Sequence, residues 1–487
     1  MSKQTITKNT TFLTASYIMQ KFLSFFYFVL IARYIGVEDL GKYTFALSFT
    51  TMFAVFIDLG LTQALIRETA KFWDKASNYI YTIIGIKTIL SFSIYVIVVI
   101  VINLMGYPPL TKMLVYLSGL LMVLDAMTLS FWGLFRGAQN LKYEAIAVVI
   151  NQIIILSLGI PILLMHLPLP FLMVPFIVGS LFNFIFSQVM LRKKLGLKLR
   201  FGFDEDVLQF MIGIALPFAL IAIFSRIYGY VDSVLLSYLQ GDRAIGLYAT
   251  AMKIPFALQF IPAAFAAAIF PAFSYYYVHN KAQLKLSFDK AMLFLTVIAV
   301  PISFGIYSIA DKVILTLVGP EYFDSILVLQ IMVFGLIFVF LNFPLGALMN
   351  SCDKQVTNTV LVGIVMVINI VANLIVIPIY SYIGAAVVFL FSHSLLFILS
   401  LIIARKIIPY SRRYLLTTFA KTILASVLMT IIVLSLKQYI HFSILILIGG
   451  AFYLTFMYMI RAFSKDDIAF LVNIFKKKKP EEVVSEE

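Results

Sequence analysis

Two basic residues, Lys21 and Arg226, occupy equivalent positions in two long apolar stretches of this sequence. The offset between them, 205 residues, is the same offset that aligns "LIARYIGVEDLGKYTFA" at 30–46 with "LLSYLQGDRAIGLYATA" at 235–251 without a gap. A charged side chain at the centre of a bilayer costs about 2.5 to 3.5 kcal/mol, so it should face water or a partner. We therefore predict that Lys21 and Arg226 line a hydrated cavity and bind an anionic group.

Further ionisable residues interrupt the apolar stretches. Lys87 and Lys253 are basic, and we group them with the predicted cationic cavity. The acidic residues Asp58, Asp125 and Asp232 have two interpretations. They pair with the buried cations, which we favour, or they bind a coupling ion, either H⁺ or Na⁺.

Polar and aromatic residues follow the two cations at helical spacing. Tyr17 and Ser24 share a helix face with Lys21, and Tyr230 and Ser233 follow Arg226. We predict that these four residues line the same cavity. Small polar residues also join neighbouring helices within membranes, and that interpretation fits the two serines equally well.

The elements that must position these residues are membrane-spanning helices. Hydrophobic residues make up 62% of the 487-residue chain and charged residues only 12%, which is far more apolar surface than a soluble fold buries. A span needs about 20 apolar residues. We predict fourteen spans, near residues 9–34, 42–67, 78–104, 111–135, 143–165, 168–191, 207–239, 243–275, 286–310, 323–350, 355–378, 382–404, 414–437 and 440–461.

The repeat predicts how these spans are organised. Six spans separate its copies, and because six is even, both halves enter the bilayer in the same direction. We therefore expect an all-α polytopic protein with two six-helix lobes related by a pseudo-two-fold axis along the membrane normal. The predicted parts are an N-terminal lobe at 1–200, a C-terminal lobe at 201–410, two further spans at 411–463, and an amphipathic helix with a charged tail at 464–487.

The basic residues also predict orientation. Most of the 37 Lys and Arg residues fall in segments that are cytoplasmic if the N-terminus is inside, and short basic loops are retained there. Both termini should then be cytoplasmic and the chain a multi-pass protein of the cell membrane. Lys476 to Lys479 should contact anionic membrane lipids. The net charge of +14 is thus a topology signal, and we expect no nucleic acid partner.

Signatures of catalysis are missing from the sequence. The four histidines are scattered without metal-ligand spacing, and no glycine-rich phosphate loop occurs. We therefore predict a transporter rather than an enzyme, without a metal or another cofactor. An integral glycosyltransferase or polymerase remains a less favoured alternative, because such an enzyme ordinarily needs a large loop outside the membrane.

Longer motifs resemble a known family. The segments "ARYIGVEDLGKYTFALSFT" and "DLGLTQALIRETA", with "ALPFALIAIFSRIYGYVDSVLLSYLQGDRAIGLYATAMKI" and "IFPAFS" in the second half, resemble Wzx-type polysaccharide flippases. These belong to the multidrug/oligosaccharidyl-lipid/polysaccharide (MOP) exporter superfamily. The resemblance implies alternating access that moves a polyprenyl-(pyro)phosphate-linked oligosaccharide from the cytoplasmic to the outer leaflet, for surface polysaccharide or glycoconjugate biosynthesis.

The same superfamily offers a second interpretation, an ion-coupled multidrug antiporter. Such a protein holds cationic drugs and would use acidic residues in its cavity. Because the basic residues within the spans are prominent here, we favour the anionic cargo.

Overall fold

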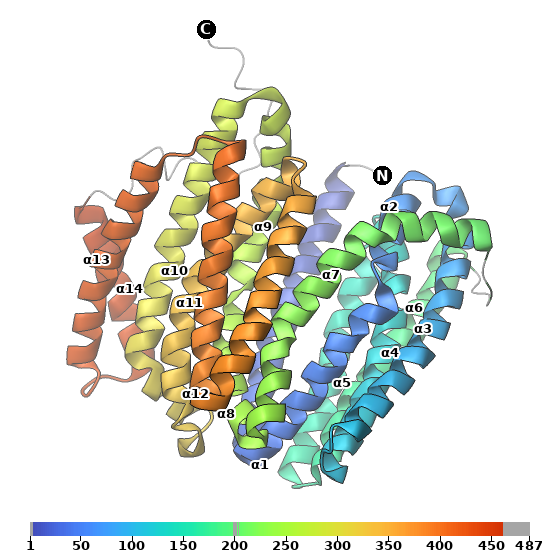
Figure 1. Cartoon of the computed structure of the whole chain (residues 1–487), viewed down its shortest axis with the longest axis horizontal. Helices are drawn as coiled ribbons and strands as arrows, with labels where there is room; N and C mark the ends of the chain where they lie inside the picture. Colours follow the sequence, from blue (N-terminus) through green and yellow to red (C-terminus); the bar gives the residue numbers. More distant parts are fainter. Residues whose placement is uncertain (1–2, 198–201, 203, 461–487) are drawn as a thin grey trace. The chain divides into compact units, whose positions relative to one another are not determined.

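The computed structural model describes residues 3–197, 202 and 204–460. Within these residues the regular secondary structure is entirely helical (Figure 1). The helices are α1 (Lys3–Asp58), α2 (Leu61–Lys71), α3 (Ala76–Leu104), α4 (Pro109–Gly137), α5 (Lys142–Leu164), α6 (Val174–Met190), α7 (Glu205–Gln240), α8 (Asp242–Leu258), α9 (Phe260–His279), α10 (Lys281–Leu317), α11 (Ser325–Ser351), α12 (Gln355–Ile407), α13 (Arg412–Leu436) and α14 (Phe442–Met459). The predicted amphipathic helix at 464–487 lies outside the described residues.

Twelve stretches of the described residues are long and apolar enough to cross a membrane. The chain is thus an all-α polytopic membrane protein, as predicted. Two stretches, Phe12–Asp58 and Gln355–Ile407, contain 47 and 53 residues, more than twice the roughly 20 that one crossing needs. Each is interrupted once by non-helical backbone, at Gly36 (φ 76°) and at Ser381 (φ 50°). These interruptions fall between pairs of predicted spans.

The structure breaks the predicted span at 42–67. Helix α1 ends at Asp58, Leu59 and Gly60 have positive φ angles of 43° and 73°, and α2 then starts in a new direction. Glycine is required here because a Cβ atom on Gly60 would lie 2.6 Å from the carbonyl oxygen of Ala215 on α7. The sequence shows the glycine but not the helix that packs against it.

The described residues group into two compact units. The first contains those within Met1–Lys253, Leu317–Asp324 and Val362–Ala385, and the second contains the remainder. Helix α7 therefore belongs to the same unit as α1, whereas sequence analysis assigned it to the C-terminal lobe. The lobes at 1–200 and 201–410 are predicted to move relative to one another during transport, and they stay a prediction.

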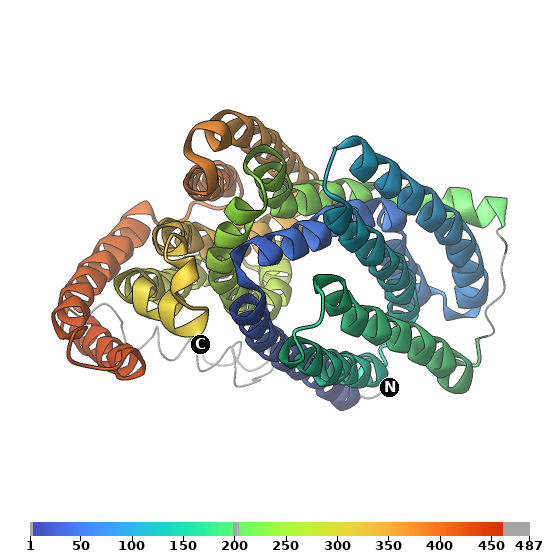
Figure 2. The ribbon, with the colours of Figure 1, turned by 90° about the horizontal axis from the view of Figure 1, so that it is seen from below.

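Helix α1 is central to the first unit, where it packs against α3, α4, α5 and α7. Figure 2 looks at these helices from one end. The core between α2, α3 and α4 is aromatic and aliphatic, with Leu65, Ile83, Phe131 and Phe135 buried in it. Such a tightly packed frame holds polar side chains at fixed positions between the helices.

In the second unit α9 packs against α11 and α13 packs against α14. Helix α13 begins at an N-cap, Ser411, whose hydroxyl accepts a hydrogen bond from the amide of Tyr414 at 3.4 Å. The phenol of Tyr453 on α14 donates to the carbonyl oxygen of Val297 on α10 at 2.9 Å. This bond joins the last helix pair to α10.

Candidate functional site

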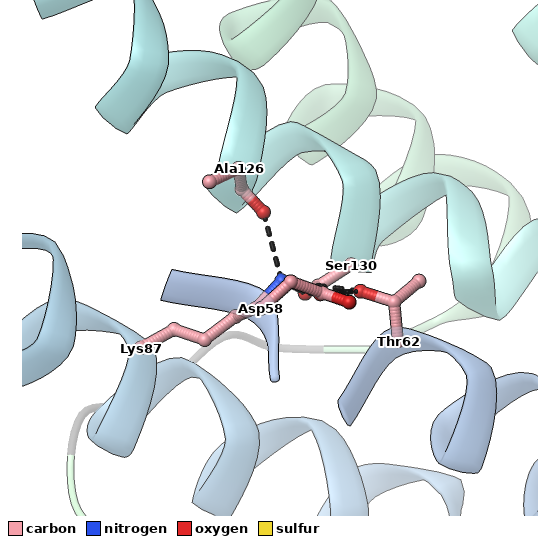
Figure 3. A network of polar contacts seen from close by, with 5 residues as sticks. All are labelled: Asp58, Thr62, Lys87, Ala126 and Ser130. Carbon is pink, nitrogen blue, oxygen red and sulfur yellow. Dashed lines mark hydrogen bonds and ion pairs between the residues drawn. The ribbon is translucent and has the colours of Figure 1, made fainter. Parts of the chain in front are cut away.

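Lys87 of α3 lies at the centre of a buried polar network (Figure 3). Its Nζ is 2.5 Å from Oδ1 of Asp58 and donates to the hydroxyls of Thr62 at 3.1 Å and Ser130 at 2.7 Å. It also donates to the carbonyl oxygen of Ala126 at 2.9 Å. Thr62 in turn donates to Asp58. One ammonium group therefore joins the end of α1 to α2, α3 and α4.

This network changes the interpretation of Lys87. Its side chain is 0% exposed and is surrounded by oxygen atoms, so no part of it faces a cavity in this conformation. A buried ion pair of this kind requires good geometry and further hydrogen bonds, and here Thr62 and Ser130 supply them. We correct the sequence-based assignment accordingly and treat Lys87 with Asp58 as an internal clamp of the first unit.

Lys253 of α8 is placed differently. Its Nζ lies 4.6 Å from the centroid of the Phe28 ring on α1, within range of a cation–π interaction. Phe28 shares a helix face with Lys21 and Ser24, seven and four residues earlier, and Lys21 is exposed. Seven residues of helix rise roughly 10 Å. The face of α1 that carries Lys21 thus also meets the second cation.

Lys21 and Lys253 differ from Lys87 in their partners. Within the part of the chain that the structure describes, neither forms a salt bridge or a hydrogen bond, and Lys253 has only the ring of Phe28. We name Lys21, Ser24, Phe28 and Lys253 the cationic face.

Tyr17 lies one turn before Lys21 on the same face of α1. Its hydroxyl donates to Oε1 of Glu144 at 2.7 Å and accepts from Arg136 at 3.3 Å. Arg136 binds Glu144 with two nitrogens, at 2.5 and 3.0 Å, and Glu144 is buried. Sequence analysis missed this pair. The signal was present, since an Arg and a Glu eight residues apart bracket the turn between two predicted spans.

Arg226 of α7 is exposed, and its guanidinium carbon lies 5.9 Å from the ring centroid of Tyr230, one turn later. Ser233, by contrast, is buried among the helices of the first unit. We therefore correct the assignment of Ser233 as a cavity-lining residue for this conformation. Arg226 and Tyr230 keep that assignment as a prediction.

Asp232 on α7 is a buried carboxylate held by neutral groups. It is 6% exposed and accepts hydrogen bonds from Asn373 of α12 at 2.7 Å and from the hydroxyl of Tyr248 on α8 at 3.1 Å. Asn373 also donates to the side-chain oxygen of Asn369 at 3.2 Å, while its own Oδ1 is buried without a hydrogen-bond partner. Among the described residues no basic side chain pairs with Asp232. Asp232 is therefore held by two neutral hydrogen-bond donors instead of a basic side chain.

Asp125 on α4 has an exposed side chain and accepts a hydrogen bond from the hydroxyl of Ser180 on α6 at 2.6 Å. It does not pair with a basic residue within the described ranges. The three predicted acidic residues thus have three environments: Asp58 contacts a lysine, Asp232 contacts amides and a phenol, and Asp125 contacts a serine. No group of three or more His, Cys, Asp or Glu side chains among the residues described is arranged to hold a metal ion.

The second unit contains an apolar groove of about 460 Å³ between α10, α13 and α14. Leu258, Ile302, Val433 and Gly450 are among the residues that line it, and a Cβ atom on Gly450 would meet nothing within 4 Å. Almost all of the atoms that line this groove are apolar. It suits an alkyl or isoprenoid chain and offers little to a polar ligand.

Two family models match the sequence. One, described as "Polysaccharide biosynthesis protein", matches residues 6–277, more than half of the 487-residue chain. The other, described as "MatE", matches residues 217–375. Both cationic-face lysines lie within the first match.

Individual relatives agree with these models. The "Capsular polysaccharide biosynthesis protein CapF" of Staphylococcus aureus is 23% identical over 388 residues, 78% of this chain and 94% of the relative. "Uncharacterized membrane protein MJ1068" of Methanocaldococcus jannaschii is 25% identical over 447 residues, 84% of this chain and 85% of its own length. Among solved structures, "Lipid II flippase MurJ, inward closed conformation" has the same fold, with a TM-score of 0.77, 17% identity, and coverage of 92% of this chain and 98% of that one.

Proposed function

Because this chain belongs to the polysaccharide biosynthesis protein family of the MOP transporter superfamily, we propose that it flips a polyprenyl-linked oligosaccharide between the leaflets of the cell membrane. The transporter fold points to transport rather than catalysis. The finer proposal includes fourteen crossings, because the two bent stretches are each long enough for two. It also includes two lobes related by a pseudo-two-fold axis that alternate access to one cavity.

One observation supports the choice of cargo: Lys21 on α1 has no carboxylate partner, and neither has Lys253 of α8, which lies over Phe28 on the same face of α1. A (pyro)phosphate group is anionic and cannot enter hydrocarbon alone. Lys21 and Lys253 offer positive charge that no acidic side chain of the described chain neutralises. Such unpaired charge within a span is retained at a cost and indicates a binding role. We assign the phosphate contacts to these two lysines, with Arg226 as a third cation.

Aromatic side chains beside these cations suit the sugar part of the cargo. Tyr230 lies half-buried next to Arg226, and Tyr17 lies one turn from Lys21. Both rings present an apolar surface that fits a sugar ring, and Tyr230 adds a hydroxyl, whereas the hydroxyl of Tyr17 is bound to Glu144 and Arg136. Ser24 completes the cationic face.

The lipid tail requires a different surface. The apolar groove between α10, α13 and α14 offers almost pure hydrocarbon, and each buried CH₂ group contributes about 0.8 kcal/mol. We propose that the first isoprene units of the carrier occupy this groove. Replacing Gly450 by Leu would fill it, because the space around that glycine is open.

The cationic face is tested by flipping in vesicles of defined composition. Reconstituted protein receives a fluorescent polyprenyl-pyrophosphate oligosaccharide, and reduction by dithionite reports the fraction in each leaflet. Lys21→Ala should slow flipping by about tenfold or more, because removing a charge contact to phosphate costs about 1.5 to 3 kcal/mol. Lys21→Arg should keep most of the rate. Lys142→Ala is the matched control, since Lys142 is an exposed lysine at the start of α5.

The result decides between the candidate functions. Flipping that is unchanged in Lys21→Ala and in Lys253→Ala would reject the proposed site. Extension of the labelled glycan by the purified protein would instead indicate a glycosyltransferase or polymerase.

For coupling we propose Asp232. Its buried carboxylate has no basic partner, and Asn373, which donates to it, has a buried side-chain oxygen without a hydrogen-bond partner. A Na⁺ ion or a proton would neutralise that charge when bound. The ion gradient that drives transport is then one of H⁺ or of Na⁺. Flipping is measured in vesicles that have one gradient at a time, and the gradient that accelerates flipping identifies the coupling ion.

The proposal also includes a location and an orientation. Both termini face the cytoplasm, and the basic segment at 476–479 contacts anionic lipids of the inner leaflet, although these residues lie outside the described ones. Protease digestion of a C-terminal tag in sealed inside-out vesicles tests the orientation.

A second candidate function, a multidrug antiporter, is favoured by one observation. Asp125 is an exposed carboxylate within a span, and it would suit a cationic drug. Two results together would support this function. The Asp125→Asn variant would lose efflux of a cationic dye, and the wild-type protein would not flip the labelled oligosaccharide.

A further inference from the structure

A polar cavity of about 280 Å³ lies beside the bend of α1 in the first unit. Tyr34 and Asp39 line this cavity from α1, and His166 lines it from the turn between α5 and α6. The rings of Tyr34 and His166 have centroids 6.1 Å apart and planes inclined by 48°. Both side chains are exposed, so a ligand can reach them. We name Tyr34, Asp39 and His166 the ring site.

A second cavity, of about 620 Å³, continues the first. Ile35 and Asp39 line both cavities, so the two spaces adjoin at the bend of α1. Glu38, Arg243 and Glu321 also line the second cavity. All of these residues belong to the first unit. The ring site is therefore one end of a longer polar groove.

The wall of this groove opposite the ring site is fixed by the turn after α10. The phenol of Tyr322 in this turn donates to the carbonyl oxygen of Ala32 at 2.7 Å, which attaches the turn to α1. The same turn places Oε2 of Glu321 beside Gly36, where a Cβ atom would lie only 3.3 Å from that oxygen. Gly36 also has φ 76°, which a residue with a Cβ atom rarely adopts. The carboxylate of Glu321 thus has a fixed place beside the bend.

The charges along the groove are mainly acidic. Lys42 donates to Oδ1 of Asp39 at 2.7 Å, and the guanidinium of Arg243 lies 3.7 Å from a carboxylate oxygen of the turn after α10. Both basic residues are therefore paired. Glu38 and Glu321 form neither a hydrogen bond nor a salt bridge with any described residue. Their charges make the groove negative, so it repels a phosphate group.

Aromatic rings beside carboxylates suit a sugar. The apolar face of a sugar ring packs on an aromatic side chain, and its hydroxyls donate charge-assisted hydrogen bonds to carboxylates. The groove also has a suitable size, since sites for small molecules measure about 300 to 1,000 Å³. A metal ion is a poorer match, because no three His, Cys, Asp or Glu side chains among the described residues are arranged to hold one.

We propose that the ring site binds an uncharged sugar unit of the oligosaccharide on the outer side of the membrane. The basic residues of the chain predict that the bend of α1 and the turn between α5 and α6 lie outside. The two parts of the cargo then meet opposite charges. The cationic face attracts the phosphate, whereas the acidic groove repels the phosphate and binds the sugars as they leave the protein. This inference rests on the proposed function, which supplies the oligosaccharide.

Protection from chemical labelling tests the site and its side of the membrane together. In a Cys352→Ala background, which removes the single cysteine, Leu167→Cys places a thiol on an exposed residue that lines the first cavity. A membrane-impermeant maleimide labels this thiol in right-side-out vesicles. The probe is the oligosaccharide of the flipping assay, freed from its lipid and its pyrophosphate. Half-maximal protection is expected at about 1 mM oligosaccharide, a weak affinity.

Two variants and one control show where the oligosaccharide binds. Tyr34→Ala should raise the half-protecting concentration about tenfold, because the stacking surface is lost. His166→Ala should raise it about threefold, and it replaces Tyr34→Ala if that protein does not accumulate. Tyr439→Ala is the matched control, because Tyr439 is exposed at the turn between α13 and α14, on the same predicted side. Inorganic pyrophosphate at the same concentrations should give no protection.

The outcomes separate this site from the proposed function. Lys21→Ala should lose flipping and keep wild-type protection, because the cationic face is not part of the ring site. Protection that is unchanged in both ring-site variants, that is lost in Lys21→Ala, or that pyrophosphate gives equally well overturns the ring site.

Flipping by the wild type completes the comparison. A wild type that flips the cargo while the free oligosaccharide gives no protection overturns the ring site and leaves the proposed function intact. Protection that depends on Tyr34 without any flipping supports the ring site and rejects the proposed flipping. Absence of both protection and flipping rejects both.

Discussion

Charged side chains lie between helices in two regions of the first unit, and the partners of these charges differ between the two regions. Between α1 and α4 the charge of Lys87 is matched by Asp58 and by two hydroxyls. On α7 and α8, Asp232 is surrounded by neutral partners and Lys253 rests on an aromatic ring. The free-energy cost of removing two opposite charges from water is offset by the contact between them. A charge without such a partner lowers stability unless another group or a ligand binds it.

The role of a charged residue within a span depends on the partners that surround it. Lys87 and Lys253 are the same residue type and both interrupt apolar helices, so their sequence context does not separate them. Their surroundings do. We infer that a charge paired with an opposite charge has a structural role, and that a charge without such a partner has a role in binding or transport.

The largest expected effect tests the matched region. Lys87→Met should lower the free energy of unfolding by about 3 to 5 kcal/mol, because Asp58 is left charged without its partner. Chemical unfolding in detergent micelles measures the change. The double variant Asp58→Asn/Lys87→Met should recover most of the loss, since it removes both charges. A Lys87→Met protein as stable as the wild type would mean that this pair is not a clamp.

The unmatched lysine should show the reverse pattern. Lys253→Met should leave the free energy of unfolding within about 0.5 kcal/mol of the wild type, because no partner is stranded. Flipping of the labelled lipid-linked oligosaccharide should nevertheless fall by about tenfold or more, for the loss of a charge contact. Lys253→Arg is the conservative control and should retain flipping. Loss of stability together with activity would place Lys253 in the frame beside Lys87.

Asp232 extends the comparison to an acidic residue. Asp232→Asn removes a buried charge that no basic residue of the described chain matches, so we expect stability to hold or to rise. The dependence of flipping on the H⁺ or Na⁺ gradient should disappear, while downhill flipping continues. Rates in reconstituted vesicles with and without each gradient provide the measurement. A gradient dependence that persists in Asp232→Asn would remove this residue from coupling.

The smallest effect concerns the ring beneath Lys253. Phe28→Leu keeps the apolar contact and removes the cation–π interaction, which contributes about 0.5 to 1 kcal/mol at a partly exposed site. Apparent affinity for the pyrophosphate lipid should fall only a few-fold, measured from the dependence of the flipping rate on lipid concentration. Phe92→Leu, the same change at an exposed phenylalanine of α3, is the matched control away from the cationic face.

Much of the fold follows from local properties of the chain. Apolar runs of sufficient length predict the helices, and most predicted spans agree with the observed helices within a few residues. One exception has a tertiary cause and the other a local cause, the two prolines. Helix α1 stops at Asp58 because Gly60 packs on α7, and the predicted span at 243–275 is divided at Gln259 between Pro255 and Pro262.

The candidate site followed from the sequence only in outline. Residue type and hydropathy identify which charges are embedded, since those depend on neighbours along the chain. Which charge meets which depends on helices that are distant in sequence, as Asp232 and Asn373 show across 141 residues. Sequence analysis therefore grouped Lys87 with Lys253, and it missed Glu144 as the partner of Arg136.

The membrane class, the positions of the helices and the repeat with its offset can be obtained from the amino-acid sequence, because each depends on composition or on direct comparison of residues. The partners of the charged residues, and the contact of the two repeat copies at Gly41 with Asp242 and at Gly246 with Val37, are visible only in the folded chain. Pairing energies depend on distances of a few ångströms between groups on different helices, and these distances are set when the helices pack.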